Sequence, residues 1–402
     1  MWNLPHGAFF KKGKLSPPMS LSSPAHSPAH SPAHFPSPWV AIILVNYRDA
    51  HDTIECLDSL LALDYPRFEV FVVDNDSRDE SLQTVARWCE RPERAASWKN
   101  FAGVHSYTRD GEPAPVAYRH VKPCTEGLPP PPAGYRVSLV ASDTNSGFAG
   151  GCNIGMRTAG QRFDYFWLLN TDTVAAHNAL RELVTRATAD SAIGMVGATI
   201  WYYDQPDTAQ ALGGASVSTQ GLVFKNIGDR EHFPAGLPNI KDVESKLGLI
   251  LGASILVSSA CVKNVGPIQE DYFLYFEEYD WALRARGAWV LGWARDAMVY
   301  HKGGGSSTRT SLHTFAMTLR YRNLVRFTAR FLPERLPEVR RQLWRHFARY
   351  LAQGRWRGIW VVGGALRHFS ALAASARPGD VPTSTPLDPH GKPRPVAIEV
   401  GL

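Results

Sequence analysis

The feature that most constrains this chain is a continuous apolar run followed by alternating strand-like and helix-like segments. Residues 40–45 read Val-Ala-Ile-Ile-Leu-Val, which is typical of a strand buried on both faces. Apolar residues then recur at helical spacing over 54–61, a second strand pattern covers 68–73, and another helical pattern covers 82–88. This order predicts an α/β fold with a mostly parallel central sheet flanked by helices.

A long interruption separates the two parts of this pattern. Residues 91–135 are rich in Pro, Gly, Arg and Tyr and include four consecutive prolines, which predicts a surface insertion. Strand patterns resume at 137–141 and 165–169, and the second half of the domain is expected at about 247–307. The length of 402 residues accommodates one large α/β domain, which we expect to span residues 39–310.

Both ends of the chain have compositions that disfavour folded structure. The tetrapeptide Ser-Pro-Ala-His occurs three times in tandem within residues 23–34. Because proline at this density removes backbone donors, residues 1–38 are expected to form a disordered, inert tail whose histidines bind metal weakly at most. Residues 377–402 are again rich in proline and are expected to be loose.

The excess positive charge is concentrated in one segment, which we expect to be helical over residues 311–376. The net charge is +6, and residues 320–357 contain eleven Arg against two Glu. Apolar residues recur there at three- and four-residue steps, with arginines on the other faces: Leu336, Val339, Leu343 and Phe347. This pattern predicts a basic amphipathic helix.

Two interpretations of the basic segment remain open at this point. It associates in plane with an anionic membrane, or it packs on the folded domain with a solvated arginine face. Three tryptophans strengthen the membrane interpretation: Trp344, Trp356 and Trp360. A nucleic-acid partner is not expected, because no recognised nucleic-acid-binding motif accompanies the basic residues.

Several features favour a cytoplasmic location. No apolar stretch approaches the roughly 18–20 residues that span a bilayer. The N-terminus lacks the apolar core and the small-residue cleavage site of a secretory signal. The five cysteines are scattered without a CxxC pair, which predicts reduced thiols rather than disulfides or a zinc site.

Polar clusters follow three of the predicted strands. Tyr47 and Asp49 follow the first strand, residues 74–79 (Asp-Asn-Asp-Ser-Arg-Asp) follow the second, and residues 170–173 (Asn-Thr-Asp-Thr) follow the strand at 165–169. Ligands bind in the crevice beyond the carboxyl ends of strands in open parallel sheets. Each cluster alone is also typical of turns and helix caps, so only their combination favours a ligand site.

A glycine-dense segment covers residues 145–155, Asn-Ser-Gly-Phe-Ala-Gly-Gly-Cys-Asn-Ile-Gly. It does not match the GxGxxG dinucleotide fingerprint. Two interpretations are about equally supported: backbone amides at a helix N-terminus that suit a diphosphate, or glycines that allow close packing of a helix on the sheet.

An aromatic and acidic stretch is the most informative part of the second half. Residues 271–286 begin Asp-Tyr-Phe-Leu-Tyr-Phe and continue with three carboxylates at the start of a predicted helix: Glu277, Glu278 and Asp280. Carboxylates stabilise the positive end of a helix, but three so close together repel one another, which raises a pKa and suits a general base. Downstream, His301 precedes three glycines at a predicted strand end.

From residue 40 to about 307, the chain resembles the family 2 glycosyltransferases, in particular their rhamnosyltransferase-like branch. The segments that carry the resemblance appear in the family's order and cover about two-thirds of the chain: 43–47, 73–77, 145–151, 168–173, 252–257, 272–280 and His301 with its glycines. The resemblance implies the GT-A fold, in which a nucleotide-binding half is joined to an acceptor-binding half.

The resemblance also implies roles for individual residues. Asp74 would hold the base of the donor, and Asp172 would bind the metal, Mn²⁺ or Mg²⁺, with His301 completing the site. Asn170 stands where the family has the first Asp of its DXD motif, a departure that leaves fewer charged ligands. Glu278 aligns best with the catalytic base. The expected donor-binding residues are Tyr47, Asp74, Asn75, Asn145, Gly147, Phe148, Gly150, Asn153, Asn170 and Asp172.

The implied activity is an inverting transfer of a sugar, with rhamnose from a dTDP-sugar favoured, to a glycan or lipid-linked acceptor in cell-envelope or polysaccharide synthesis. The enzyme would act at the inner face of the cell membrane. Two alternatives remain: a degenerate member that binds nucleotide or glycan without turnover, which Asn170 favours, and a Rossmann-type oxidoreductase, which the missing GxGxxG disfavours.

Overall fold

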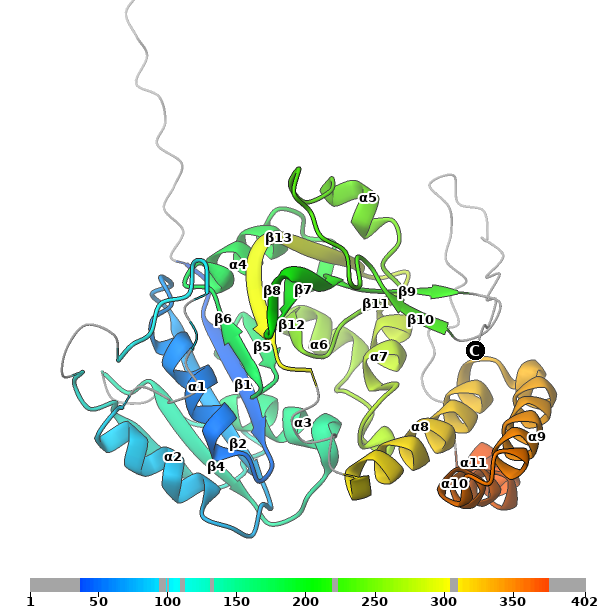
Figure 1. Cartoon of the computed structure of the whole chain (residues 1–402). Coiled ribbons are helices and arrows are strands. Elements are labelled where there is room, and N and C mark those ends of the chain that lie inside the picture. The colour runs from blue at the N-terminus through cyan, green and yellow to red at the C-terminus, as the bar shows by residue number, and fades with distance from the viewer. Residues whose placement is uncertain are drawn as a thin grey trace, which may run out of the picture. The chain divides into compact units, whose positions relative to one another are not determined.

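The structure is a computed structural model, and it describes residues 37–93, 99, 101–108, 113–130, 134–218, 223–303 and 310–375. The tails predicted at 1–38 and 377–402 lie outside these residues, apart from Ser37 and Pro38. The described chain folds around a ten-stranded sheet, with a second sheet of three strands beside it (Figure 1).

The central sheet confirms the predicted α/β fold class. Its strand order is β3-β4-β2-β1-β5-β12-β7-β13-β6, and β8 pairs with β7. The pairs from β3 to β5 are parallel, as is β7 with β13, whereas β12, β6 and β8 run antiparallel to their neighbours. The strands are β1 Val40–Asn46, β2 Phe68–Asn75, β3 Tyr118–Val121, β4 Val137–Ser142, β5 Tyr165–Leu169, β6 Thr173–Ala175, β7 Ile193–Tyr202, β8 Gln205–Leu212, β12 Ser254–Ser258 and β13 Val290–His301.

Helices cover both faces of this sheet, which explains why β1 is apolar throughout. Val40, Ile42 and Leu44 belong to the core on one face, with residues of α1, α2 and α4, whereas Ala41 and Ile43 belong to the core on the other face, with residues of α3, α6 and α7. The helices that flank the sheets are α1 Ala50–Leu61, α2 Ser81–Glu90, α3 Gly147–Ala159, α4 Ala179–Thr188, α5 Ile240–Glu244, α6 Ser259–Val265 and α7 Glu277–Ala285.

The insertion at 91–135 differs from the predicted surface loop, because parts of it belong to the core. Strand β3 lies within it and pairs in parallel with β4 at the sheet edge. Phe101 is buried and stacks on Tyr300 of β13, with ring centroids 4.3 Å apart. Its few aromatic and aliphatic residues are enough to cover the sheet edge, although its average composition is that of a loop.

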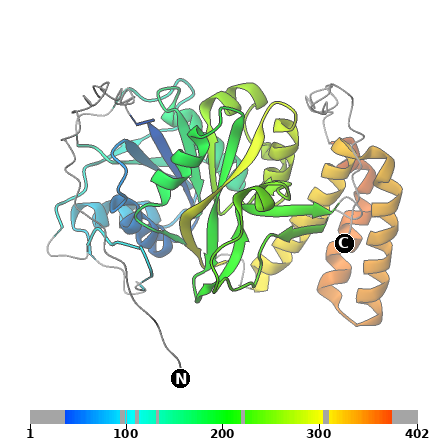
Figure 2. The ribbon, with the colours of Figure 1, turned by 90° about the horizontal axis from the view of Figure 1, so that it is seen from above.

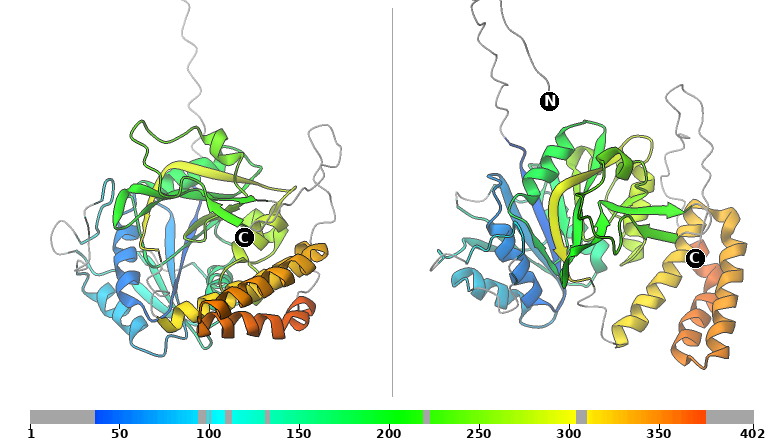
Figure 3. Two further views of the ribbon diagram at one scale, coloured as in Figure 1. Left: turned by 45° about the vertical axis from the view of Figure 1, so that its right-hand side comes forward. Right: turned by 45° about the horizontal axis from the view of Figure 1, so that its top comes forward.

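Four helices form the C-terminal part of the described chain: α8 Thr310–Phe331, α9 Leu336–Ala352, α10 Trp356–Arg367 and α11 Phe369–Ala374. Helices α9 and α10 run side by side, and α10 and α11 contact α8 (Figures 2 and 3). The predicted apolar face of α9 is buried in this packing, with Val339 3% and Leu343 0% exposed. That face is therefore not available for insertion into a membrane.

Helix α8 also packs on the domain that contains the central sheet. Phe327 of α8 stacks on Tyr279 of α7, with ring centroids 4.5 Å apart. The second sheet, formed by β9 Gly214–Ser218, β10 Val223–Asn226 and β11 Leu249–Ile250, contributes Phe224 to the same aromatic cluster. Among the residues that the structure describes, no helix is both long and apolar enough to cross a membrane.

Candidate active site

The carboxyl ends of β1 and β2 carry a polar cluster centred on Asp74. Asn46 is its register partner and donates to Asp74 Oδ1 at 2.7 Å. Ser77 donates through its hydroxyl at 2.5 Å and through its backbone amide at 3.1 Å. These donors fix the half-buried carboxylate at the sheet edge, and Tyr47 lies in the adjoining segment, 36% exposed.

Asn75 has a different environment from the one expected of a donor-binding residue. It is 2% exposed, and its Nδ2 donates to Asn145 Oδ1 at 3.0 Å and to the Gly147 carbonyl at 2.9 Å. Its Oδ1 accepts from the Ser146 amide at 3.2 Å. Asn75 and Asn145 therefore join the end of β2 to the loop before α3, a structural role that does not support direct donor contact.

The glycines of α3 allow close packing on the sheet. A Cβ atom at Gly151 would lie 2.5 Å from Val45, and one at Gly155 would lie 2.4 Å from Ile43. Either substitution would push the helix away from β1. For these glycines, the packing interpretation of the sequence is the one that the contacts support.

The N-terminus of α3 faces protein rather than an open crevice. Gly147 has a φ of +73°, and a Cβ atom there would lie 2.2 Å from the Phe273 carbonyl. Asn153, one of the expected donor-binding residues, is 1% exposed and exchanges hydrogen bonds with the backbone of Ile268. Phe148 is half-buried, and Gly150 is held against Ser146. The predicted diphosphate contacts at Gly147, Gly150 and Asn153 are not supported by these positions.

The two predicted metal ligands meet at the end of β13. His301 Nε2 lies 3.2 Å from Asp172 Oδ1, and both side chains are mostly buried. Asn170 Nδ2 lies 3.4 Å from the same imidazole nitrogen, although the two residues are 131 positions apart in the sequence. The Lys302 amide donates to the Asp172 carbonyl at 3.0 Å, which fixes the 170–173 turn against β13.

Gln210 on β8 orients this histidine, and sequence analysis did not identify it. His301 Nδ1 donates to Gln210 Oε1 at 2.6 Å, which directs Nε2 toward Asp172 and Asn170. Gln210 is 9% exposed, so the interaction is shielded from water. The only sequence signal was a polar residue at the end of a largely buried strand.

We expect Gln210→Ala to weaken Mn²⁺ binding about 10–100-fold, because the imidazole loses the partner that fixes its ring orientation. The measurement is Mn²⁺ titration by calorimetry or by electron paramagnetic resonance. Gln205→Ala is the matched control, since Gln205 lies on the same strand with an exposed side chain. Equal Mn²⁺ affinity in the two variants would contradict an orienting role for Gln210.

A network of charged side chains lies next to the pair formed by Asp172 and His301. Lys302 Nζ donates to Asp52 Oδ1 at 2.6 Å and to Glu55 Oε2 at 2.5 Å, both on α1. Glu55 Oε1 also accepts from the Tyr203 hydroxyl at 2.5 Å. These contacts connect the end of β13 to α1, so they fix the position of the residue that follows His301.

Glu278 lies in the first turn of α7 with its carboxylate against the backbone of Gly252. A Cβ atom at Gly252 would lie 2.3 Å from Glu278 Oε1, so only glycine permits this approach. Burial raises the pKa of Glu278, and hydrogen bonding from its own amide and that of Gly252 partly opposes the shift. A carboxylate in this state is a stronger base than an exposed one.

Glu277 differs from Glu278 in its surroundings. It is 1% exposed, and its Oε2 has no hydrogen-bond partner among the described residues. Burial, and then the charge of Glu278, raise the pKa of Glu277 well above its ordinary value. The repulsion between the two carboxylates is mutual, but Glu277 is the more deeply buried of the two, so Glu278 is the member of the pair that we expect to ionise first.

The loop before α7 is strained and is held by a residue of α8. Phe273, Tyr275 and Phe276 have φ values of 64°, 72° and 77°, a left-handed conformation that is costly for aromatic residues. Asn323 Nδ2 donates to the carbonyls of Tyr272 and Leu274 at 2.8 Å each and to that of Tyr275 at 3.0 Å. Asn323 is fully buried and thereby positions the loop that leads to Glu278.

Asp280 differs from the prediction that Glu277, Glu278 and Asp280 together form the catalytic carboxylates. It is fully buried, and Arg284 donates to Oδ1 at 2.6 Å. Its Oδ2 accepts from the Tyr272 hydroxyl at 3.1 Å and lies 3.2 Å from Arg330 Nη1. Because both oxygens bind buried partners within the protein, Asp280 is a structural ion-pair residue and not a base open to substrate.

The Asp172 and Glu278 clusters share one edge of the sheet. Strand β12 pairs antiparallel with β5, with Ser254 opposite Leu169. Just beyond this pair, the Asn170 amide donates to the Ala253 carbonyl at 3.1 Å. Gly252, the neighbour of Ala253, supports Glu278, so the two clusters are joined through adjacent residues of one turn.

Polar side chains thus gather at one edge of this α/β sheet, and comparisons with known proteins match part of the chain to one family. The sequence profile described as "Glycosyl transferase family 2" matches residues 41–104 and 124–235. The match supports a family 2 glycosyltransferase and a glycosyl-transfer function. It includes Asp74 and Asp172, while Glu278 and His301 lie beyond it.

Individual relatives are distant. The low-salt glycan biosynthesis hexosyltransferase Agl10 of Haloferax volcanii is 24% identical over 155 residues, which are 37% of this chain and 46% of that protein. This chain therefore matches less than half the length of that relative. The name of that protein refers to hexosyl transfer.

Solved structures that were matched to this chain include two of low sequence identity. The mannosyltransferase PcManGT from Pyrobaculum calidifontis, in complex with GDP-Man and Mn²⁺, is 17% identical with a TM-score of 0.45, over 86% of this chain and 77% of that one. TarS 1-349 from S. aureus is 14% identical with a TM-score of 0.40, over 70% of this chain and 64% of that one.

Proposed function

We propose that this chain is an inverting, metal-dependent glycosyltransferase that moves a sugar from a nucleotide-sugar donor to an acceptor hydroxyl. The observation that most supports this proposal is the pairing of Asp172 with His301, together with the backbone link from their turn to the residue beside Gly252, which contacts Glu278. Asp172 and His301 lie 3.2 Å apart, and Glu278 lies on Gly252, next to the residue that bonds Asn170. These are the side chains that a metal-assisted displacement requires.

The proposed reaction is a single in-line displacement. The acceptor oxygen forms a bond to the anomeric carbon of the donor while the bond from that carbon to the diphosphate oxygen breaks, which inverts the configuration. Glu278 accepts the proton of the acceptor hydroxyl. Asp74, held by Asn46 and Ser77, would accept hydrogen bonds from the base of the nucleotide.

The residues present fit a divalent metal ion. Asp172 offers a carboxylate oxygen and His301 an imidazole nitrogen, and this mixed set suits Mn²⁺ or Mg²⁺ with further oxygen ligands from diphosphate and water. Within the described residues, no group of three or more His, Cys, Asp or Glu side chains gathers in metal-binding geometry, so the protein would supply few ligands. When bound, the ion neutralises charge on the departing nucleoside diphosphate.

We expect removal of divalent metal by a chelator to abolish transfer and restoration with Mn²⁺ to recover it. The measurement is release of nucleoside diphosphate from a panel of dTDP-, UDP- and GDP-sugars with and without an acceptor. The resemblance favours dTDP-rhamnose, and the name of the Haloferax relative also keeps hexosyl donors in the panel.

Thermal-shift measurements separate the alternatives. Stabilisation by nucleoside diphosphate together with Mn²⁺, accompanied by turnover, supports the proposal. Metal-independent stabilisation without turnover on any donor would identify a degenerate binding protein, and stabilisation by NAD would identify an oxidoreductase. Either result would overturn the proposed activity.

The proposed acceptor is a glycan or a lipid-linked hydroxyl in cell-envelope or polysaccharide synthesis, at the inner face of the cell membrane. Residues 311–376 support association with an anionic surface through their arginines. The apolar face of α9 is already used in packing, so the exposed tryptophans supply the apolar contact: Trp344, Trp356 and Trp360.

A further inference from the structure

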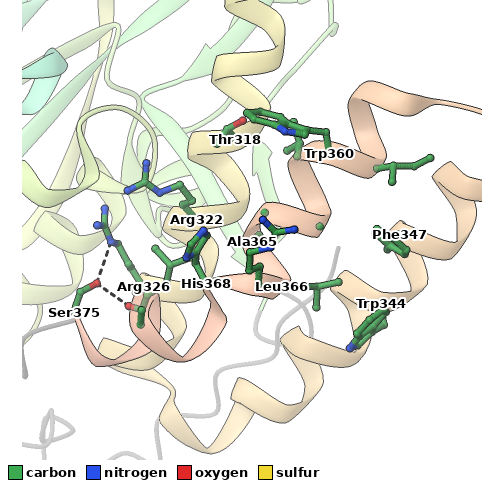
Figure 4. Close-up of a pocket in the computed structure, with 17 residues that line it drawn as sticks. Thr318, Arg322, Arg326, Trp344, Phe347, Trp360, Ala365, Leu366, His368 and Ser375 are labelled. Atoms are coloured by element: carbon green, nitrogen blue, oxygen red, sulfur yellow. Dashed lines mark hydrogen bonds between the residues drawn. The ribbon is translucent and has the colours of Figure 1, made fainter.

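The C-terminal helices line an open cavity of about 1070 Å³ that the proposed chemistry does not use. Residues of α8, α9, α10 and α11 line it, with Arg322 and Arg326 on one side of the close-up and Trp344 and Phe347 on the other (Figure 4). Its volume is slightly above the range, about 300–1,000 Å³, that is typical of pockets for small organic ligands. The cavity therefore has room for a molecule rather than a few waters.

One side of this cavity is positively charged. Arg322, Arg326 and His368 lie close to one another there (Figure 4), and none of the described residues that line the cavity is a carboxylate. Arg326 donates to the Asp271 carbonyl at 2.6 Å and to Ser375 Oγ at 3.4 Å. Burial, and then the charge of Arg322, lower the pKa of Arg326, and the charge of Asp271 opposes only part of this shift, so a bound anion would relieve the remaining repulsion between the two arginines.

The other side of the cavity is apolar and open to solvent. Phe347, Ile359 and Leu366 form its wall, and two tryptophans also line it, Trp344 at 53% and Trp360 at 71% exposed. Exposed tryptophans beside a basic surface are typical of proteins that lie at a membrane interface. An elongated ligand with an anionic group at one end and hydrocarbon at the other matches both sides.

We propose that this cavity binds one anionic phospholipid of the membrane, with its phosphate at Arg322 and Arg326 and its hydrocarbon chain against Phe347, Trp344 and Trp360. This inference rests on the proposed membrane association and adds a defined site for a single lipid. The same helix that binds the phosphate also carries Asn323, which holds the loop before Glu278. Lipid binding at this site would therefore fix the orientation of the active site toward the membrane.

The first test compares vesicle flotation of paired variants of the full chain, using phosphatidylcholine vesicles with and without phosphatidylglycerol. We expect Arg322→Gln/Arg326→Gln to weaken binding to the anionic vesicles more than Arg341→Gln/Arg345→Gln, which removes the same charge from exposed α9 positions outside the cavity. General attraction to a charged surface predicts that each lost arginine weakens vesicle binding about fivefold, equally in both pairs of variants. Equal losses would overturn the site.

A second pair tests the apolar side. Trp360 lines the cavity, whereas Trp356, on the same helix and 74% exposed, does not. We expect Trp360→Ser to lose binding and Trp356→Ser to keep most of it. Equal effects of the two substitutions would indicate interfacial contact without a defined site, and would overturn the proposal.

Two measurements on the unmodified chain make the test independent of variant folding. Native mass spectrometry with phosphatidylglycerol should show one bound lipid per chain, and hydrogen exchange should slow in peptides covering residues 318–326 and 358–372. Absence of that protection, or equal protection by glycerol phosphate alone, would overturn the lipid assignment.

A dimer that Trp360→Ser dissociates would instead identify a second copy of this chain as the occupant. All of these readouts require no donor sugar, so they fail or succeed independently of the proposed transferase activity.

Discussion

Glu278→Gln is expected to lower turnover about 10²–10⁴-fold while leaving donor binding intact. Glutamine has the shape of glutamate but accepts no proton, so the acceptor hydroxyl loses its base. In the proposed site, the binding of nucleoside diphosphate and Mn²⁺ depends on other residues, namely Asp172, His301 and Asp74. The measurements are turnover with the identified donor and acceptor, and donor affinity by calorimetry.

Glu277→Gln identifies which carboxylate is the base. This substitution removes the Glu277 carboxylate, which is 1% exposed, and leaves the Glu278 carboxylate, which is half-buried. We expect this variant to keep most of its turnover. If Glu277→Gln is inactive and Glu278→Gln is active, the base is Glu277; if both variants retain turnover, neither carboxylate serves as the base.

The pH dependence of the unmodified enzyme tests the same assignment. The base acts as a carboxylate, so activity falls as pH decreases through the pKa of Glu278. Burial raises that pKa above the ordinary glutamate value of about 4.3, so the acidic limb of kcat/KM is expected at a higher pH than for an exposed glutamate. An acidic limb at or below the ordinary value would argue against Glu278.

The sequence predicted the central sheet because its strands follow from local pattern. The apolar runs at 40–45 and 68–73 are strands β1 and β2, and the polar residues after them lie at the sheet edge, as Asp74 does. The proximity of Asp172 to His301 was implied by family resemblance alone, since pairing of β13 with β6 is not encoded in local sequence.

Residues that act through tertiary contacts were not predictable in this way. Gln210 orients His301 from a strand that carries no recognisable motif, and Asn323 holds a loop about fifty residues earlier in the chain. Conversely, Asn75 and Asn153 occupy positions near the expected donor site but use their amides for backbone hydrogen bonds. A sequence pattern identifies a polar residue, whereas the direction of its side chain depends on the neighbouring elements.

The basic C-terminal segment illustrates the same limit. Its helical periodicity was sufficient to predict a helix at 336–347, and α9 covers that range. The partner of its apolar face could not be predicted, because an amphipathic stripe packs equally well on protein or on a membrane. The structure supplies α8 and α10 as that partner and leaves exposed tryptophans elsewhere on the surface.

Asp280→Ala is expected to reduce the free energy of unfolding by about 3–5 kcal/mol, the largest stability effect that we anticipate for a single substitution. Arg284 and Arg330 would remain buried, at 7% and 8% side-chain exposure, without the carboxylate that neutralises them. The loss would affect three elements at once, because Asp280 connects α7 to α8 through Arg330 and to the segment before the strained loop through Tyr272.

The measurement is urea or thermal unfolding, with Asp271→Ala as the control. Asp271 is an exposed carboxylate nearby, and its loss should change stability by no more than about 0.5 kcal/mol. The loss of stability in Asp280→Asn should lie between those of Asp280→Ala and Asp271→Ala, because the amide retains one acceptor oxygen but no charge. An Asp280→Ala protein with unchanged stability and a loss of turnover equal to that of Glu278→Gln would contradict the structural role and return Asp280 to the catalytic group. A destabilised protein that keeps its activity at low temperature would confirm that Asp280 acts on the fold that carries Glu278, and not on the substrate.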